Sequence, residues 1–113
     1  APFASHQLAR LARRVGMGLG RLGSWGGNGS GDLFLAFSTA NRGNDTSTTA
    51  QSFQMWPNEP IDPFFPATID ATEEAVVNAM LAAETMTGAD GLRLEALPAD
   101  RLVAALRKYG RMP

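Results

Sequence analysis

The sequence predicts an α+β fold, because strand-like patterns come early in the chain and helical patterns occupy most of its second half. Residues 16–22, GMGLGRL, alternate glycine with larger side chains, as on a strand with one smooth face. Residues 33–38, LFLAFS, are apolar at almost every position and predict a strand covered on both faces. Residues 71–88 carry the strongest helical pattern. These features predict a sheet inside a layered structure, followed by helices.

Helical periodicity marks three segments of the chain. Residues 5–15, SHQLARLARRV, repeat apolar residues on one helical face. Residues 71–88, ATEEAVVNAMLAAETMTG, have a broad apolar side, as expected of a helix held against a sheet, and Gly88 is a suitable stop. Residues 98–110, PADRLVAALRKYG, predict a further amphipathic helix that ends in glycine.

The connections between these elements also have distinct patterns. Residues 41–54 are polar and predict an exposed loop, and residues 89–97 predict a turn and a short strand. Between the loop and the helix at 71–88, a proline recurs at every third position, which matches the turn of a polyproline II helix: Pro57, Pro60, Pro63 and Pro66. We expect an extended connector here, with Trp56, Phe64 and Phe65 packed onto the body of the protein.

Composition excludes several classes of function. The chain has 113 residues and a net charge of −1, so it lacks the basic field that would hold nucleic acid or an anionic membrane. It has no cysteine, which excludes thiol catalysis and thiolate metal sites. His6 is the one histidine, so a histidine-based metal site or a Ser–His–Asp relay cannot be built from this chain alone. We expect no cofactor, no metal, and a cytoplasmic location.

The glycine-rich segment 26–31, GGNGSG, allows three interpretations. A phosphate-binding loop requires a helix after the glycines, but an apolar strand pattern follows here, so we reject this interpretation. A hairpin turn is favoured locally, because Asn28-Gly29 is the preferred pair of a type I′ turn. The turn explains neither the other glycines nor the serine placed between Gly29 and Gly31.

The third interpretation uses that serine. A hydroxyl can attack the carbonyl carbon of the preceding residue, and glycine at that position permits the unusual backbone that the attack needs. Cleavage at the Gly29–Ser30 bond leaves serine as a new N-terminus. Its α-amine, with an ordinary pKa of about 7.7–8.0, can then act as the base for its own hydroxyl. Ser30 would therefore need no histidine.

The segment 27–41, GNGSGDLFLAFSTAN, closely resembles the self-cleavage junction of the DmpA-type aminopeptidases, a family that includes L-aminopeptidase/D-esterases and β-peptidyl aminopeptidases. Residues 6–23 and 71–88 are also similar to this family, in the same order. The resemblance implies part of an αββα four-layer sandwich of the N-terminal-nucleophile-like type, shared with ornithine acetyltransferase. Those acetyl-transferring neighbours generally use threonine as the nucleophile, so the serine argues for hydrolysis.

The resemblance also implies how the chain is organised. A precursor is cut before the serine, so residues 1–29 form the end of the α portion and residues 30–113 form the β portion, within one incomplete structural domain. The mature enzyme removes N-terminal residues from short peptides, amides or esters that carry a free amine, and it is usually an oligomer. The implied partners are the remainder of the α portion, the substrate and further copies of the enzyme.

Carried over residue by residue, Ser30 matches the nucleophile and Gly29 supplies the bond that is cut. The family's second hydroxyl and its glutamate match Thr72 and Glu74, or Glu73 if the alignment shifts by one position. The alternative for these three residues is an ordinary helix cap with acidic side chains at the positive end of the helix. The alternative for the whole chain is a non-catalytic interaction module in which residues 26–31 are only a hairpin turn.

Overall fold

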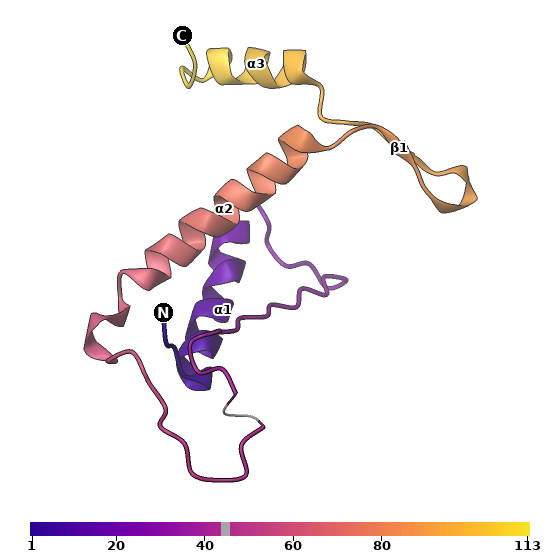
Figure 1. Cartoon of the computed structure of the whole chain (residues 1–113). Helices are drawn as coiled ribbons and strands as arrows, with labels where there is room; N and C mark the ends of the chain where they lie inside the picture. Colours follow the sequence, from indigo (N-terminus) through magenta and orange to yellow (C-terminus); the bar gives the residue numbers. More distant parts are fainter. Residues whose placement is uncertain (44–45) are drawn as a thin grey trace. The chain divides into compact units, whose positions relative to one another are not determined.

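The computed structural model describes residues 1–43 and 46–113 (Figure 1). The chain divides into two compact units, residues 1–73 and residues 74–113, with the division inside one long helix. The helices and strands of the described residues are α1 (Ser5–Arg21), α2 (Phe64–Ala82), β1 (Met86–Thr87), β2 (Arg93–Leu94) and α3 (Ala99–Lys108), with short 3₁₀ turns at Glu59–Ile61 and Ala89–Gly91.

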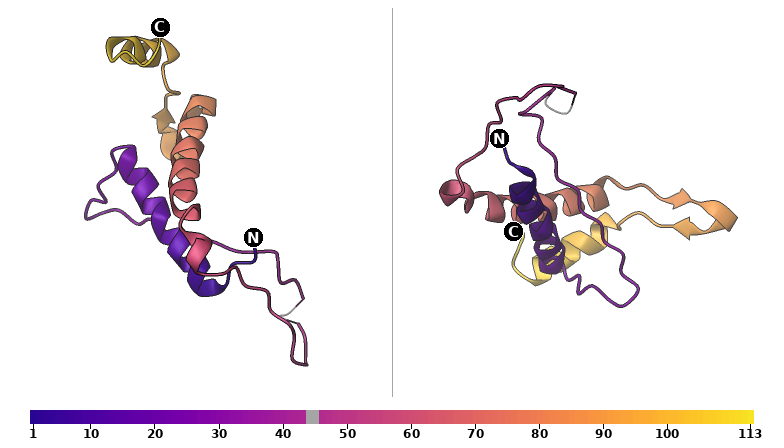
Figure 2. Two further views of the ribbon diagram at one scale, coloured as in Figure 1. Left: turned by 90° about the vertical axis from the view of Figure 1, so that its left-hand side faces the viewer. Right: turned by 90° about the horizontal axis from the view of Figure 1, so that it is seen from below.

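Helix α1 confirms the predicted helix at 5–15 and extends it to Arg21. The predicted strand at 16–22 is therefore wrong. Glycine at alternating positions weakens a helix by roughly 1 kcal/mol per residue, but it also allows a close approach to another helix. At Gly18 this approach occurs: an added Cβ would lie 2.7 Å from the Cβ of Thr72 and 2.8 Å from the carbonyl oxygen of Ile69. Figure 2 shows α1 against the first half of α2.

The core of the first unit forms where the N-terminus meets the start of α2. Phe3 is buried, and its ring stacks edge-on with Phe64 at 4.9 Å and with Trp56 at 6.3 Å between centroids. Gln7 is fully buried: its Oε1 accepts a hydrogen bond from the Ala4 amide and its Nε2 donates one to the Trp56 carbonyl. The expected packing of Trp56 and Phe64 onto the body is confirmed.

The proline-rich segment does not form a polyproline II helix. Residues Glu59–Ile61 form a 3₁₀ turn, and α2 begins at Phe64, with Pro66 in its first turn. The first four amides of a helix have no acceptor within the helix, so proline is tolerated there. Phe65 also packs on the body, since the guanidinium groups of Arg10 and Arg14 lie over its ring at 4.9 and 3.8 Å.

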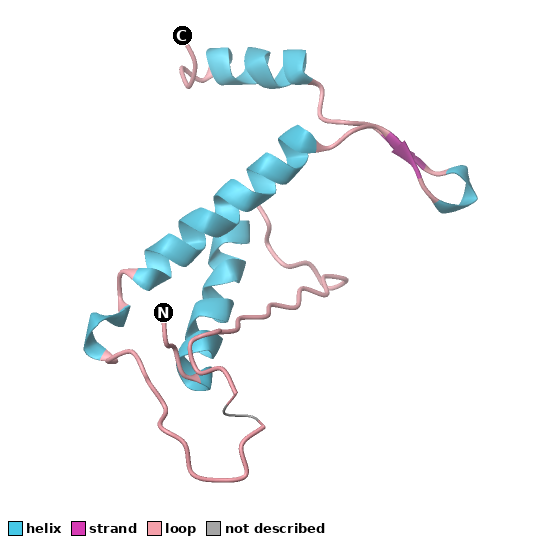
Figure 3. Cartoon of the chain, in the orientation of Figure 1, coloured by secondary structure: helices cyan, strands magenta, loops and turns pink. Residues whose placement is uncertain are grey.

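Residues 33–38 run as an unpaired segment, so the predicted buried strand is not formed within this chain (Figure 3). Alternate side chains differ in exposure: Leu33, Leu35 and Phe37 are 96%, 88% and 76% exposed, whereas Phe34 is 39% exposed and Ala36 is half-buried. A strand needs a hydrogen-bonding partner, and none of the described residues pairs with this segment. The described parts of the predicted loop, 41–43 and 46–54, contain no helix or strand; residues 44–45 lie outside the described residues.

The second unit contains the end of α2, a hairpin and α3. Strands β1 and β2 are antiparallel, with Met86 opposite Leu94 and Thr87 opposite Arg93. Helix α2 ends at Ala82, so the predicted helix end at Gly88 is wrong, while the predicted short strand at 89–97 is confirmed as β2. Helix α3 confirms the prediction for 98–110, and Gly110 ends it with a positive φ of 64°.

Candidate functional site

The predicted cleavage junction forms an exposed turn in the first unit. The Ser30 amide donates a hydrogen bond of 2.8 Å to the Gly27 carbonyl, and Asn28 and Gly29 lie between them. Neither of these two residues has a positive φ, whereas Gly26 has a φ of 59°. A type I′ turn requires positive φ at both central residues, and no strand of the described residues flanks this turn. The type I′ hairpin is therefore wrong, although a turn is present.

Both residues of the predicted scissile bond are open to solvent. Gly29 and Ser30 are exposed, and an added Cβ at Gly29 would meet no atom within 4 Å. The turn presents the bond and the serine hydroxyl together on one exposed loop.

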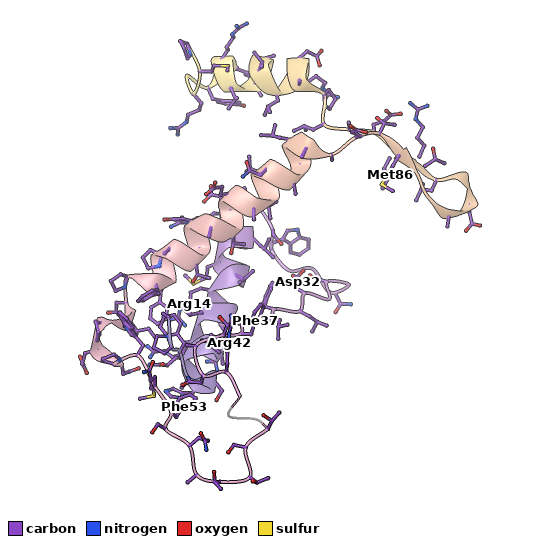
Figure 4. The ribbon with its side chains drawn as sticks, in the orientation of Figure 1. Arg14, Asp32, Phe37, Arg42, Phe53 and Met86 are labelled. Carbon is purple, nitrogen blue, oxygen red and sulfur yellow. The ribbon has the colours of Figure 1, made fainter. Side chains whose placement is uncertain are left out.

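Asp32 is a contact of Ser30 that the sequence analysis did not identify. The Ser30 hydroxyl lies 3.0 Å from Asp32 Oδ2, the distance of a hydroxyl donating to a carboxylate. In Figure 4 Asp32 lies on the segment that leaves the junction turn. The available sequence signal was a hydroxyl donor and a carboxylate acceptor two residues apart in one loop.

Thr72 lies in the interior of α2 and does not cap it. Its hydroxyl donates a 2.7 Å hydrogen bond to the Thr68 carbonyl one turn earlier, and its side chain faces Gly18 of α1. The cap interpretation of the sequence analysis is wrong, because α2 starts at Phe64. Thr72 instead forms part of the contact between the two helices of the first unit.

The two glutamates that follow Thr72 have different surroundings. Glu73 is half-buried, and its Oε2 lies 3.5 Å from a guanidinium nitrogen of Arg21, which also lies 2.5 Å from Asp70 Oδ1. The hydrogen bond that Arg21 donates to Asp70 is the main cause that raises the pKa of Arg21 above its ordinary value, against a smaller opposing effect of desolvation. Glu74 is exposed and belongs to the second unit.

The structure therefore brings the predicted site residues together in two groups. The junction group contains Gly29 and Ser30, joined by Asp32. The helix group contains Thr72 and Glu73, held against α1 through Gly18 and Arg21. Within the described residues no cluster of three or more His, Asp or Glu side chains is placed to hold a metal ion. Among the helices of the described residues, none has the length and apolar character that crossing a membrane requires.

The model of peptidase family S58 matches residues 1–94. The β-peptidyl aminopeptidase BapA of Sphingosinicella microcystinivorans is 45% identical over 113 residues, and BapA of Sphingosinicella xenopeptidilytica is 39% identical over 110 residues. These matches cover 99% and 95% of this chain but 28% and 27% of the relatives, so the chain spans a little over a quarter of their length.

Solved structures show the same relationship. The L-aminopeptidase D-Ala-esterase/amidase of Ochrobactrum anthropi, described as a prototype serine aminopeptidase and a new variant of the Ntn hydrolase fold, is 49% identical with a TM-score of 0.86. The PH0078 protein of Pyrococcus horikoshii is 43% identical with a TM-score of 0.90. Each match covers 99% of this chain and 32% of the solved chain. The predicted fold class, part of an α–β sandwich of the Ntn hydrolase type, is confirmed.

Proposed function

The chain belongs to peptidase family S58, and from this premise we propose that it carries the nucleophile of a serine-type aminopeptidase. In this proposal the Gly29–Ser30 bond is cut by the Ser30 hydroxyl, and Ser30 becomes an N-terminal nucleophile. The mature enzyme then releases N-terminal residues from short peptides, amides or esters. The cut divides the chain into residues 1–29, from the α portion, and residues 30–113, from the β portion.

The observation that carries the proposal is the junction turn. The family match includes this turn, and Gly29 and Ser30 are exposed there, with no side chain on Gly29 to obstruct the carbonyl carbon. The hydroxyl of Ser30 is already hydrogen-bonded to a carboxylate, which favours loss of its proton during attack. A surface loop that only reversed the chain would need neither a serine after the glycine nor this contact.

Self-cleavage converts the Gly29–Ser30 amide into an ester and then into two free chain ends. The Ser30 oxygen bonds to the Gly29 carbonyl carbon, the C–N bond breaks, and the Ser30 nitrogen takes up a proton to become an amine. Gly29 is then held as an ester on the Ser30 oxygen, and water hydrolyses this ester to release the Gly29 carboxylate. The nitrogen that becomes the new amine is the one that donates a hydrogen bond to the Gly27 carbonyl in the uncut chain.

Turnover of substrate uses the same oxygen with a different base. The free amine of Ser30 removes the hydroxyl proton as the oxygen attacks the carbonyl of the substrate's first residue. The leaving amine or alcohol takes that proton, and water releases the residue from the resulting ester. Because the base is the nucleophile's own amine, activity requires the cut to come first.

We assign supporting roles to Thr72 and Glu74, the second hydroxyl and the glutamate that polarise the nucleophile. Glu73 is the alternative by a shift of one position. The contact of Glu73 with Arg21 supports Glu74 as the assisting carboxylate, since Glu73 is already engaged at 3.5 Å by a guanidinium that it shares with Asp70. We further propose that the chain works with the remainder of an α portion, because it covers little more than a quarter of its curated relatives. We also propose that it works as an oligomer, on the family resemblance alone.

The test is intact mass and N-terminal sequencing, with the chain expressed alone and together with the portion that precedes it in its own gene. We expect a fragment that begins SGDLFLAF in the second case and hydrolysis of amino-acid anilides by the cut protein. Ser30→Ala abolishes both. The matched control Ser24→Ala, at an exposed serine of the same loop, leaves both unchanged.

The opposite result supports the non-catalytic alternative. If the protein stays uncut with the preceding portion present, or if Ser30→Ala is cut as fast as the natural chain, residues 26–31 are only a turn. If the protein is cut and Ser30 is required, activity towards α-amino and β-amino substrates is compared in the cut protein to establish its preference.

A further inference from the structure

The second unit has no buried core of its own. None of residues 74–113, all of which the structure describes, is buried. In its hairpin Met86, Leu92 and Leu94 are 61%, 65% and 60% exposed, and Met86 is labelled in Figure 4. An isolated two-stranded hairpin is marginal in water, and a sheet becomes stable with three or more strands and an apolar face. The hairpin of β1 and β2 therefore lacks the partner strands that such a sheet needs.

The two faces of the hairpin differ in chemistry. Met86 lies opposite Leu94 in the ladder, and the Gly88 amide donates a hydrogen bond to the Leu92 carbonyl. Because side chains alternate between the faces of a strand, Met86, Leu92 and Leu94 share one face, which is apolar. The residues between them form a polar face: Thr85, Thr87, Arg93 and Glu95.

The outer edge of β2 offers free backbone groups. In an antiparallel ladder, residues whose backbone groups point to the partner strand alternate with residues whose groups point away. The Leu92 carbonyl bonds to Gly88 of the other strand, so Leu94, two residues later, also directs its backbone groups inward. Arg93 and Glu95 therefore direct theirs to the outer edge. The sheet of the described residues has two strands only, and such an open edge is a template for a further strand.

This edge is complementary to itself. When two copies pair antiparallel about a twofold axis through Leu94, Arg93 of each copy lies opposite Glu95 of the other, where their outward backbone groups meet. Within one copy the Arg93 guanidinium already lies 2.9 Å from Glu95 Oε1, so the paired edges form a ring of four alternating charges. An axis through Arg93 or through Glu95 would instead place two like charges opposite each other. The charges therefore select one register.

We infer that residues 92–96 form a twofold interface with a second copy of this chain, and that the two hairpins join into one four-stranded sheet. The inference deepens the proposed oligomer and rests on it, but it does not depend on the cut at Gly29–Ser30. Leu94 lies on the axis, and the apolar faces of both hairpins become continuous. The interface is isologous, so each copy contributes the same edge.

Exchange of charge between copies tests the interface, with the preceding portion of the protein present. Arg93→Glu and Glu95→Arg each replace two attractive cross-strand pairs by repulsive ones. We expect each variant alone to associate about tenfold or more weakly than the natural protein in sedimentation. A mixture of the two variants recovers association, because each copy supplies the charge that the other lacks. The control Arg101→Glu reverses an exposed charge at the start of α3 and changes nothing.

The recovery in the mixture separates the interface from a role within one chain. The contact between positions 93 and 95 of a single copy is broken in both variants, and mixing does not repair it. Only a contact between copies is restored when the two variants are combined.

A cysteine on the axis tests the register. Directly opposed residues of this kind have Cα atoms about 4.5 Å apart, within the range of a disulfide. The 113 residues contain no cysteine, so Leu94→Cys is expected to form a disulfide-linked dimer under mild oxidation. Met86→Cys is the matched control on the same face of the other strand. It is about 14 Å from its copy, three strand spacings away, and does not link.

The results that contradict the inference are distinct from those that contradict the proposed function. If the mixture does not recover association, or if Leu94→Cys does not link, the edges do not pair in this way and the inference is wrong. Linking through Met86→Cys would place the axis at β1 and also overturn it. A protein that sediments as a single copy at every concentration overturns the inference together with the proposed oligomer. Sequencing of the new N-terminus in the same samples tests the aminopeptidase proposal separately.

Discussion

At the scale of single residues, Gly18 determines how closely the two helices of the first unit approach. A Cβ at this position would lie below 3 Å from both a side-chain carbon of Thr72 and a backbone oxygen of Ile69. The backbone oxygen cannot rotate away as a flexible side chain can. An alanine at position 18 therefore forces α1 and α2 apart and moves Thr72.

We predict that Gly18→Ala destabilises the protein by about 1–3 kcal/mol, as is usual when a methyl group is forced into a close contact. Gly20→Ala is the matched control, because it lies in the same helix with no atom within 4 Å of an added Cβ. It is expected to stabilise the helix by up to about 1 kcal/mol. Urea unfolding followed by circular dichroism measures both. Equal effects of the two substitutions would show that the close approach is absent.

At the scale of elements, Arg21 connects the end of α1 to α2. Asp70 and Glu73 are three residues apart on α2, where two like charges repel each other. Arg21 lies between them, 2.5 Å from one and 3.5 Å from the other, and thereby turns a repulsive pair into an attractive group. All three side chains remain largely in contact with solvent, so the interaction is sensitive to salt.

We predict that Arg21→Gln lowers the melting temperature at low salt and that the difference disappears near 1 M salt, where charges are screened within about 3 Å. The control Arg13→Gln changes an exposed arginine of the same helix and has little effect at either salt concentration.

The variant Arg21→Gln also tests the proposed role of Glu74. If Glu74 is the assisting carboxylate, releasing Glu73 from Arg21 leaves the cleavage rate unchanged, whereas a changed rate would favour Glu73.

The elements also show which parts of the fold are predictable from local patterns. Helix periodicity identified α1 and α3, because the apolar face of an amphipathic helix is encoded within a few turns. The alternating glycines at 16–22 were misread, since the same pattern suits a strand face and a close helix contact, and only the partner helix distinguishes them. The start of α2 was missed because the prolines there were taken as part of an extended connector. Pro63 directly precedes α2 and Pro66 lies in its first turn, where proline is tolerated.

The candidate site was predictable where its pattern was local. A turn at 26–31 is one interpretation that the sequence allows, and a turn is present there, while cleavage at Gly29–Ser30 stays a prediction. The contact of Ser30 with Asp32 was not anticipated, since both residues lie in an irregular loop whose side-chain directions follow no periodic pattern. Arg21 and Glu73 are 52 residues apart in the chain, so their contact depends on tertiary packing that no local pattern encodes.

At the scale of the whole molecule, the segment 33–37 combines exposed apolar side chains with a backbone that is not paired in a sheet. Leu33, Leu35 and Phe37 point alternate side chains into solvent, and the backbone there has no strand partner among the described residues. Exposed apolar rows of this kind mark sites of interaction or aggregation. If the chain works with the remainder of an α portion, as proposed, we expect that portion to pack against this apolar row and to pair with its backbone. The predicted strand at 33–38 then forms only when that portion is present.

We therefore predict that the chain alone binds a hydrophobic dye and self-associates, and that both decrease when the preceding portion is supplied. Leu35→Lys introduces a charge into the row, so it reduces self-association of the isolated chain but also weakens its capture of the preceding portion. The control Thr48→Lys adds the same charge to an exposed polar loop and changes neither property. Sedimentation and co-purification measure the two effects. If Leu35→Lys captures the preceding portion as well as the natural chain does, the row is not the surface that this portion covers, and strand formation at 33–38 would need another partner.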